Sequence, residues 1–172
     1  FMPEITGKWQ YTPHSNRDEL DGKSGAFECV KASGENRGPV RVRGKFDFGF
    51  ADGTPFYPFG TTVYAMIHQP DELLEETFAT LEKSPFNKIR ICVFPKNYAF
   101  NDNEPPVYPF EIVEGADPAG INEVAAWDFA RLNPAFFERL ERTVDRLDGL
   151  GIQCDLILFH PYDKGHWGFD RM

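Results

Sequence analysis

The chain has 172 residues, of which 41% are hydrophobic and 15% aromatic. A chain of this size buries about 70% of the surface that it exposes when unfolded, so a small disulfide scaffold and a disordered tail are excluded. The 18 Lys and Arg against 27 Asp and Glu give a formal charge of −9. Phosphate binding needs clustered positive charge, so we expect no nucleic acid partner and favour a neutral polar ligand. No run approaches the ~20 apolar residues of a membrane span, so we expect no membrane partner.

The cysteines and the chain ends carry separate information. With 3 cysteines, not all can pair within one chain. Cys92 and Cys154 lie in apolar runs and are expected to be small buried hydrophobic residues, as is Cys29. They leave the compartment undecided between cytoplasmic and secreted. The chain starts at Phe1 without an initiator Met or a signal pattern and stops at Met172, so we expect it to be a piece of a longer protein.

The first 44 residues alternate between short strands and turns. Residues 4–11 and 26–30 are predicted strands, residues 21–25 are a predicted turn, and residues 37–39 interrupt the pattern. Short strands with frequent turns are typical of a β-sandwich, and about three strands are too few to complete one. We therefore predict that residues 1–44 are the C-terminal part of an immunoglobulin-like β-sandwich.

A different pattern begins at residue 45. Phe occupies every second position of Lys45–Phe50, residues 51–54 predict a turn, and Pro55–Phe59 continue the run, which indicates a hairpin with a Phe-lined face. Strands then alternate with helices. The predicted strands are 59–64, 88–94 and 152–159, and the predicted helices are 71–83 and 134–149. Apolar runs joined by amphipathic helices predict a parallel sheet.

The expected fold class is α/β. A (β/α)₈ TIM barrel takes about 250 residues, so we predict that residues 45–172 are the N-terminal part of one, with about the first three strands. A small open sheet is the alternative. Residues 96–132 are a predicted long loop on the face that carries a barrel's active site. An open half-barrel exposes its third strand as an edge, so we expect contact with the remainder of its own polypeptide or with a second copy.

Two residues on the predicted strands are candidates for ligand binding. Ile89, Ile91 and Val93 share one face and are expected to pack on helices, which points Arg90 toward the barrel interior. A buried Arg needs an ionic partner or a polar pocket, so Arg90 either binds ligand or belongs to a structural ion pair. His160 ends the third strand, where barrels carry catalytic or ligand-binding residues. The alternative is a capping histidine whose partners are backbone groups.

Aromatic side chains gather at strand ends and in the two long loops. Their faces stack on the C–H faces of sugar rings, so Tyr162 and Trp167 are predicted to be exposed and to bind substrate. The alternative is that they pack the loops onto the barrel. The spacing of His160, Asp163 and His166 matches no strong metal signature, and a metal hydrolase that uses them is the weakest alternative.

Nothing in the sequence assigns a catalytic residue. Glycoside hydrolysis usually needs two carboxylates about 5 to 9.5 Å apart, and no pattern pairs any two of the loop carboxylates, most of which are expected to be solvated. These carboxylates are Glu104, Glu111, Glu114, Asp163 and Asp170. The sequence has no GxSxG elbow, no P-loop and no GxGxxG, and we expect neither a cofactor nor a metal.

Several motifs resemble a known family. Residues 48–60 (FGFADGTPFYPFG) resemble the opening hairpin and first strand of cellulase-like glycoside hydrolases of clan A. The runs 88–96 (KIRICVFPK), 127–137 (WDFARLNPAFF) and 151–163 (GIQCDLILFHPYD) are similar to a bacterial group of proteins assigned as glycosidases, often as endoglucanases. In that group an immunoglobulin-like β-sandwich of unknown function precedes a TIM barrel. Residues 4–43, with GKWQYT and SGAFECV, resemble its last strands.

The resemblance implies a (β/α)₈ barrel that hydrolyses a carbohydrate by a retaining mechanism with two glutamates. In the clan these glutamates follow strands four and seven, so both are expected beyond residue 172 and this piece alone is expected to be inactive. The resemblance also implies that Arg90 and His160 hydrogen-bond the nucleophile or the sugar, and that Tyr162 and Trp167 line the subsite. The alternative is a non-catalytic carbohydrate-binding or scaffold protein with a glycosidase-like barrel.

Overall fold

The structure is a computed structural model that describes residues 3, 5–32, 34, 36–116, 126–160, 166–167 and 169. It divides into two compact units, Phe1–Tyr57 and Pro58–Met172. Within the described part of the chain, no helix is long and apolar enough to cross a membrane.

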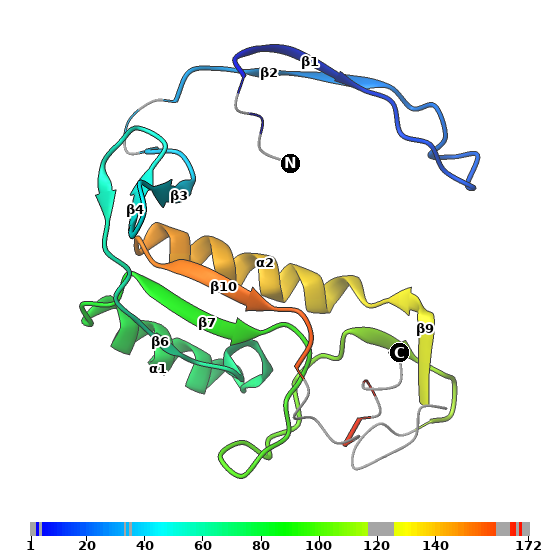
Figure 1. Ribbon diagram of the computed structural model, residues 1–172. Helices are drawn as coiled ribbons and strands as arrows, with labels where there is room; N and C mark the ends of the chain where they lie inside the picture. The colour runs from blue at the N-terminus through cyan, green and yellow to red at the C-terminus, as the bar shows by residue number, and fades with distance from the viewer. Residues whose placement is uncertain are drawn as a thin grey trace. The chain divides into compact units, whose positions relative to one another are not determined.

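The first unit contains short antiparallel strands (Figure 1). They are β1 (Gly7–Tyr11), β2 (Gly25–Cys29), β3 (Val40–Arg43), β4 (Asp47–Phe50) and β5 (Pro55–Phe56). β1 pairs with β2, and Trp9 stacks on Phe27 across the pair. β4 pairs with both β3 and β5, and Phe50 meets Phe56 edge-on with ring centroids 5.3 Å apart. This pairing confirms the predicted hairpin.

The predicted boundary after residue 44 falls in the turn between β3 and β4. These strands pair from Val40 opposite Phe50 to Arg43 opposite Asp47, so the turn lies inside one sheet. The compact units divide instead between Tyr57 and Pro58. The assignment of residues 1–44 to a β-sandwich stays a prediction.

The second unit is built on a parallel sheet with strand order β10-β7-β6. Its strands are β6 (Gly60–Thr62), β7 (Lys88–Cys92) and β10 (Gln153–Ile157), and its helices are η1 (Met66–His68), α1 (Asp71–Glu82) and α2 (Pro134–Gly149). Parallel pairing of β7 with both neighbours confirms the predicted sheet. Gly60 lies so close to β7 that a Cβ there would collide with the carbonyl oxygen of Lys88.

The core lies between this sheet and its helices. Ile89 and Ile91 of β7, and Val93 directly after it, are buried on one face, as predicted. The same cluster contains Leu74 and Phe78 of α1 and Phe136 and Leu147 of α2. Both helices therefore cover the same face of the sheet. Its three strands lie side by side in the order in which they occur in the chain. A (β/α)₈ barrel has this arrangement, whereas a doubly wound sheet has helices on both faces.

Local signals set the bounds of α2. Asn133 caps the helix, and its Oδ1 accepts a hydrogen bond from the backbone N–H of Ala135 at 3.1 Å. Pro134 occupies the first helical position, where the missing N–H costs nothing. The helix ends at Gly149, and Gly151 follows with a positive φ of 72°. These features match the predicted bounds.

The prediction of an unbroken loop over residues 96–132 is wrong. The segment contains β8 (Phe110–Ile112) and β9 (Trp127–Leu132), which pair antiparallel. Phe110 and Trp127 are buried in a second cluster with Trp167 and Phe169. Burial of these large rings stabilises the hairpin, and their partners are distant in the sequence.

The cysteines are free. Cys92 is buried, as predicted, and burial raises the pKa of its thiol to about 11. Cys154 and Cys29 are only partly buried, although burial also raises the pKa of Cys154 to about 11.

Candidate functional site

The carboxyl ends of β6, β7 and β10 meet at one edge of the sheet because the strands are parallel. Ligands of barrels and open α/β sheets bind at this edge. The segments that leave it are Val63–Gln69, Val93–Asn103 and Leu158–His160. Their side chains form the candidate site.

Arg90 lies on the sheet face opposite the helices, and its side chain is 53% exposed. Its Nη2 lies 3.7 Å from Oδ2 of Asp155, and Lys88 Nζ lies 2.8 Å from the other carboxylate oxygen. Asp155 is the cross-strand neighbour of Arg90 in the register of β10 and β7. The ion pair that the sequence left as an alternative is therefore present. The sequence did not reveal Asp155 as the partner because the register decides it.

His160 follows β10 and is half-buried. Its Nδ1 is buried, and no described residue hydrogen-bonds it, so the capping interpretation lacks a partner at this atom. The electrostatic influence of His160 extends to His68 in η1, which is completely buried. His68 Nε2 lies 3.2 Å from the carbonyl oxygen of Cys92, while its Nδ1 also has no partner among the described residues.

His68 is neutral at pH 7. Burial lowers the pKa of its imidazole to about 4, and the nearby Arg139 and His160 act in the same direction. Its ring stacks on Phe136 with centroids 6.0 Å apart. Sequence reasoning missed His68 because one histidine in an apolar stretch carries no motif.

The prediction that Trp167 is exposed is wrong. Its side chain is 1% exposed and packs with Trp127 and Phe169. Trp127 Nε1 donates to the carbonyl oxygen of Trp167 at 2.7 Å. Ring-on-ring packing buries more apolar area than an exposed loop position could, and it leaves no open indole face. Tyr162, the other predicted aromatic ligand, lies outside the described residues.

Trp167 instead holds a carboxylate. Its Nε1 donates to Oε2 of Glu104 at 2.8 Å, and the Tyr108 hydroxyl donates to the same oxygen at 2.7 Å. His166 Nε2 lies 2.9 Å from the other oxygen. Burial raises the pKa of Glu104, but the hydrogen bonds from His166, Trp167 and Tyr108 outweigh it, and the net pKa is lowered. Glu104 is therefore ionised at neutral pH and poorly suited to act as a general acid.

Most of the loop carboxylates are expected to be solvated, but Glu104 is half-buried. It accepts hydrogen bonds from Tyr108, four residues later, and from His166 and Trp167, more than sixty residues later. His166, part of the metal alternative, binds Glu104 instead. Across the described ranges, no cluster of His, Cys, Asp and Glu is arranged to hold a metal ion. Asp163 of that alternative lies outside those ranges.

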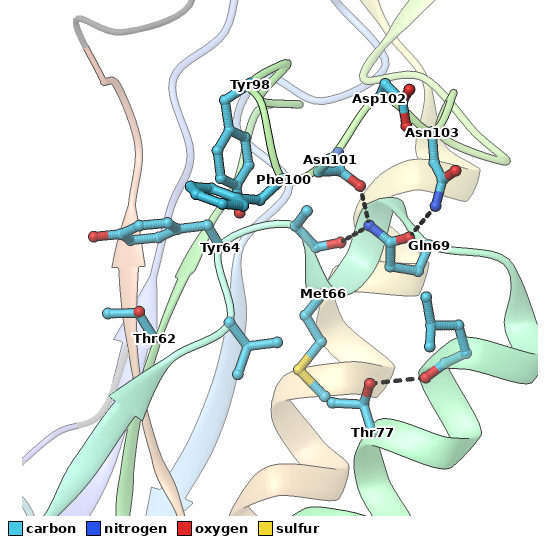
Figure 2. Close-up of a pocket in the computed structure, with 13 residues that line it drawn as sticks. Thr62, Tyr64, Met66, Gln69, Thr77, Tyr98, Phe100, Asn101, Asp102 and Asn103 are labelled. Atoms are coloured by element: carbon cyan, nitrogen blue, oxygen red, sulfur yellow. Dashed lines mark hydrogen bonds between the residues drawn. The ribbon is translucent and has the colours of Figure 1, made fainter.

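A cavity of about 540 Å³ opens beside the carboxyl end of β6 (Figure 2). Its upper wall is formed by Tyr64, Gln69, Tyr98, Phe100, Asn101, Asp102 and Asn103. Figure 2 shows the aromatic rings grouped on one side and the amides on the other. The sequence indicated the aromatic residues of this loop but not its amides. The amides are connected through Gln69, which lies before α1 and more than thirty residues earlier in the chain.

The amides form a hydrogen-bonded chain. Gln69 Nε2 donates to Oδ1 of Asn101 at 2.6 Å, and Asn103 Nδ2 donates to Oε1 of Gln69 at 2.6 Å. Asn101 Nδ2 in turn donates to the carbonyl oxygen of Lys96 at 3.2 Å. Gln69 and Asn101 are buried, so these bonds fix the loop against the segment that follows η1.

Lys96 lies between two aromatic rings. Its Nζ is 4.3 Å from the ring centroid of Tyr64 and 4.5 Å from that of Tyr98, and the residue is 8% exposed. Cation–π attraction strengthens when the cation is desolvated, so this arrangement holds Tyr98 in place. Burial raises the pKa of the Tyr98 hydroxyl, which stays protonated at neutral pH.

Arg139 of α2 hydrogen-bonds the backbone of the segment that leads from β6 to α1. Its Nε donates to the carbonyl oxygen of Ile67 and its Nη2 to that of Gln69, both at 2.8 Å. Its Nη1 pairs with Asp71 at the start of α1. One guanidinium therefore links α2, η1 and α1. Sequence reasoning missed it because these partners lie about seventy residues earlier.

Comparison with solved structures gives one strong match. No protein-family model matches the chain, and no curated protein matches it either. A "putative glycoside hydrolase from Bacteroides vulgatus ATCC 8482" matches with a TM-score of 0.86 and 46% sequence identity. The match covers 100% of this chain and 34% of that one, so the chain spans about a third of the relative's length.

Two weaker matches have low identity. A glycoside hydrolase family 5 protein from Bacteroides vulgatus ATCC 8482 gives a TM-score of 0.45 and 13% identity, over 71% of this chain and 24% of that one. The endo-1,4-beta-mannanase from Rhizomucor miehei gives 0.41 and 17%, over 68% and 28%. Scores at this level do not establish a shared fold. The first match does, and the fold of this chain is that of a segment of a glycoside hydrolase structure.

Proposed function

We propose that the protein to which these residues belong is a glycoside hydrolase. The observation that carries the proposal is the 46% identity with the Bacteroides vulgatus protein along the whole of this chain. The parallel sheet with both helices on one face supports a (β/α)₈ barrel. The clan A assignment rests on the motif resemblance. In this proposal residues 58–172 form the opening strands of the barrel, and a β-sandwich precedes them.

The proposed chemistry is retaining hydrolysis with two glutamates that follow strands four and seven, beyond residue 172. One carboxylic acid protonates the leaving oxygen, and the other carboxylate attacks the anomeric carbon to form a glycosyl-enzyme that water then hydrolyses. Glu104 fits neither role well: its lowered pKa disfavours the general acid, and its oxygens already accept three hydrogen bonds, which disfavours attack on the anomeric carbon.

In the proposal this segment supplies residues that support the reaction. Arg90, oriented by Asp155, donates hydrogen bonds to the nucleophile or the sugar. His160 does the same from the end of β10, where its Nδ1 has no partner among the described residues. Tyr162 lines the subsite, and Trp167 contributes indirectly by holding Glu104.

The test is hydrolysis by the full-length protein. It should release the aryl group from aryl glycosides or reducing ends from a neutral polysaccharide. Replacing the glutamate after strand four with Gln should lower kcat by about 10²- to 10⁴-fold. Glu104→Gln is the matched control and should leave the chemical step within about tenfold, because Glu104 is assigned no proton transfer.

The outcomes distinguish a glycoside hydrolase from a non-catalytic carbohydrate-binding protein with the same fold. A full-length protein that binds saccharides but hydrolyses none would contradict the proposal and favour the non-catalytic carbohydrate-binding alternative. Loss of kcat in Glu104→Gln equal to that of the strand-four variant would contradict the assignment of the catalytic pair.

A further inference from the structure

Phe100 is a large apolar residue whose ring lies almost entirely in solvent. Its side chain is 90% exposed, and its ring meets Tyr98 edge-on with centroids 5.9 Å apart. It lies in a tight turn closed by two backbone hydrogen bonds between Tyr98 and Asn101, of 3.1 and 2.8 Å. A large apolar ring kept in water contributes no hydrophobic stabilisation, so a bound partner would explain its position.

The turn that carries Phe100 is rigidly supported. Asn101 is bonded through its side chain to Gln69 and to the carbonyl oxygen of Lys96, and Lys96 holds Tyr98 by its charge. Arg139 fixes the Gln69 backbone in turn. Because the protein's own side chains fix this turn, binding here would cost little conformational entropy.

The polar rim of the cavity has unused hydrogen-bonding capacity. Among the described residues, no hydrogen bond reaches the Asp102 carboxylate or Oδ1 of Asn103. Asn103 also retains one amide hydrogen after its donation to Gln69. These groups combine donors with acceptors, and a sugar hydroxyl is itself both a donor and an acceptor.

The charge around the cavity favours a neutral ligand. None of the described residues that line it is Lys, Arg or His, and Asp102 stands on its rim. The formal charge of the chain, −9, also repels anions. A sugar ring has an apolar C–H face for Phe100 and hydroxyl edges for the amides.

We propose that this cavity is a binding subsite for a neutral saccharide, in which a sugar ring stacks on Phe100 and its hydroxyls bond Asp102 and Asn103. The inference rests on the proposed glycosidase function and adds a subsite built from residues other than Arg90 and His160. In this proposal the subsite binds a sugar unit other than the one whose bond is cleaved.

The experiment compares the binding of neutral and anionic hexasaccharides to the full-length protein. Isothermal titration calorimetry uses neutral hexasaccharides of glucose, mannose and xylose, with hexagalacturonate as the anionic probe. Where a probe is hydrolysed, the protein carries the strand-four Glu→Gln substitution. Phe100→Ala and Asn103→Ala should weaken binding of the preferred neutral hexasaccharide by about tenfold or more. Phe46→Ala is the matched control, because Phe46 is also a highly exposed Phe, at 85%, but lies outside this cavity. It should change binding less than about twofold.

The result separates this inference from the proposed function. Phe100→Ala should raise KM for the hexasaccharide, whereas the control Phe46→Ala should leave that KM unchanged. Equal hexasaccharide affinity in wild type and Phe100→Ala would overturn the subsite even if the protein is a hydrolase. Preferential binding of hexagalacturonate, or no binding of any hexasaccharide, would overturn it as well. Saccharide binding lost in Phe100→Ala without hydrolysis would support the subsite and contradict the hydrolase.

Discussion

Arg139 donates from Nη2 to the backbone carbonyl oxygen of Gln69 at 2.8 Å, although the two residues lie seventy positions apart. The Gln69 side chain then bonds both Asn101 and Asn103 at 2.6 Å. A helix of the core is thereby connected to the rim of the cavity through one glutamine. Arg139 is a positioning residue in this arrangement, since it touches the cavity only through Gln69.

Arg139→Lys should destabilise the second unit by about 1–3 kcal/mol. A Lys ammonium cannot reach the carbonyl oxygens of Ile67 and Gln69 and the Asp71 carboxylate together, so buried acceptors lose their donors. Urea unfolding measures the change in the free energy of unfolding. Arg142→Lys on the same helix is the control and should be close to neutral, because Arg142 is exposed and lies 3.9 Å from Glu138. Equal stability of the two variants would contradict the role of Arg139.

Gly60→Ala should destabilise the protein by about 1–3 kcal/mol, since a Cβ at this position collides with the Lys88 carbonyl oxygen and separates β6 from β7. Thermal unfolding followed by circular dichroism gives the shift in Tm. Gly149→Ala provides the comparison, because no atom lies within 4 Å of a Cβ built there and the residue is helical. That variant should be neutral or slightly more stable. A Gly60→Ala protein with unchanged Tm would exclude the close approach of the strands.

His68 should make the protein lose stability as the pH falls from 6.5 to about 4. The folded pKa is lowered, so the unfolded chain binds more protons in this window and acid favours unfolding. A shift of this size corresponds to about 3 kcal/mol. Urea unfolding at pH 7 and at pH 4 measures the loss, which should be smaller in His68→Gln. The exposed His14 gives the control His14→Gln, with the wild-type pH dependence. If His68→Gln also retains the full loss, His68 is not its source.

Glu104 should add a second, more acidic loss of stability. Its pKa is lowered in the folded protein, so its contribution is present above pH 4.5 and disappears as the pH falls through the folded pKa. Glu104→Gln removes this dependence because an amide does not ionise, and its NH2 group can only donate where one carboxylate oxygen accepted a hydrogen bond. Tryptophan fluorescence during acid titration should report the change, because the Trp167 indole bonds Glu104 directly. An identical titration in Glu104→Gln and wild type would contradict this assignment.

Local sequence signals were enough for the parallel strands and the two α-helices of the second unit, but not for β8 and β9. Asn133, Pro134 and Gly149 mark the ends of α2 through interactions within a few residues. The alternation of Ile89, Ile91 and Val93 revealed which face of β7 meets the helices. Backbone propensity, capping and hydrophobic period act over one or two turns of chain, so they can be read without the fold.

The side-chain partners of the site depended on distant parts of the chain. Asp155 meets Arg90 through strand register, and Trp167 is buried in a cluster that includes Trp127, forty residues earlier. Glu104 and Arg139 likewise bond groups that lie sixty to seventy residues distant. Composition marks such residues as polar or aromatic, but burial, ionisation and hydrogen-bond partners arise only when the chain packs. Residue type and local period thus specified the order of the parallel strands and their helices, whereas tertiary contacts formed β8 and β9 and decided which side chains remain open to a ligand.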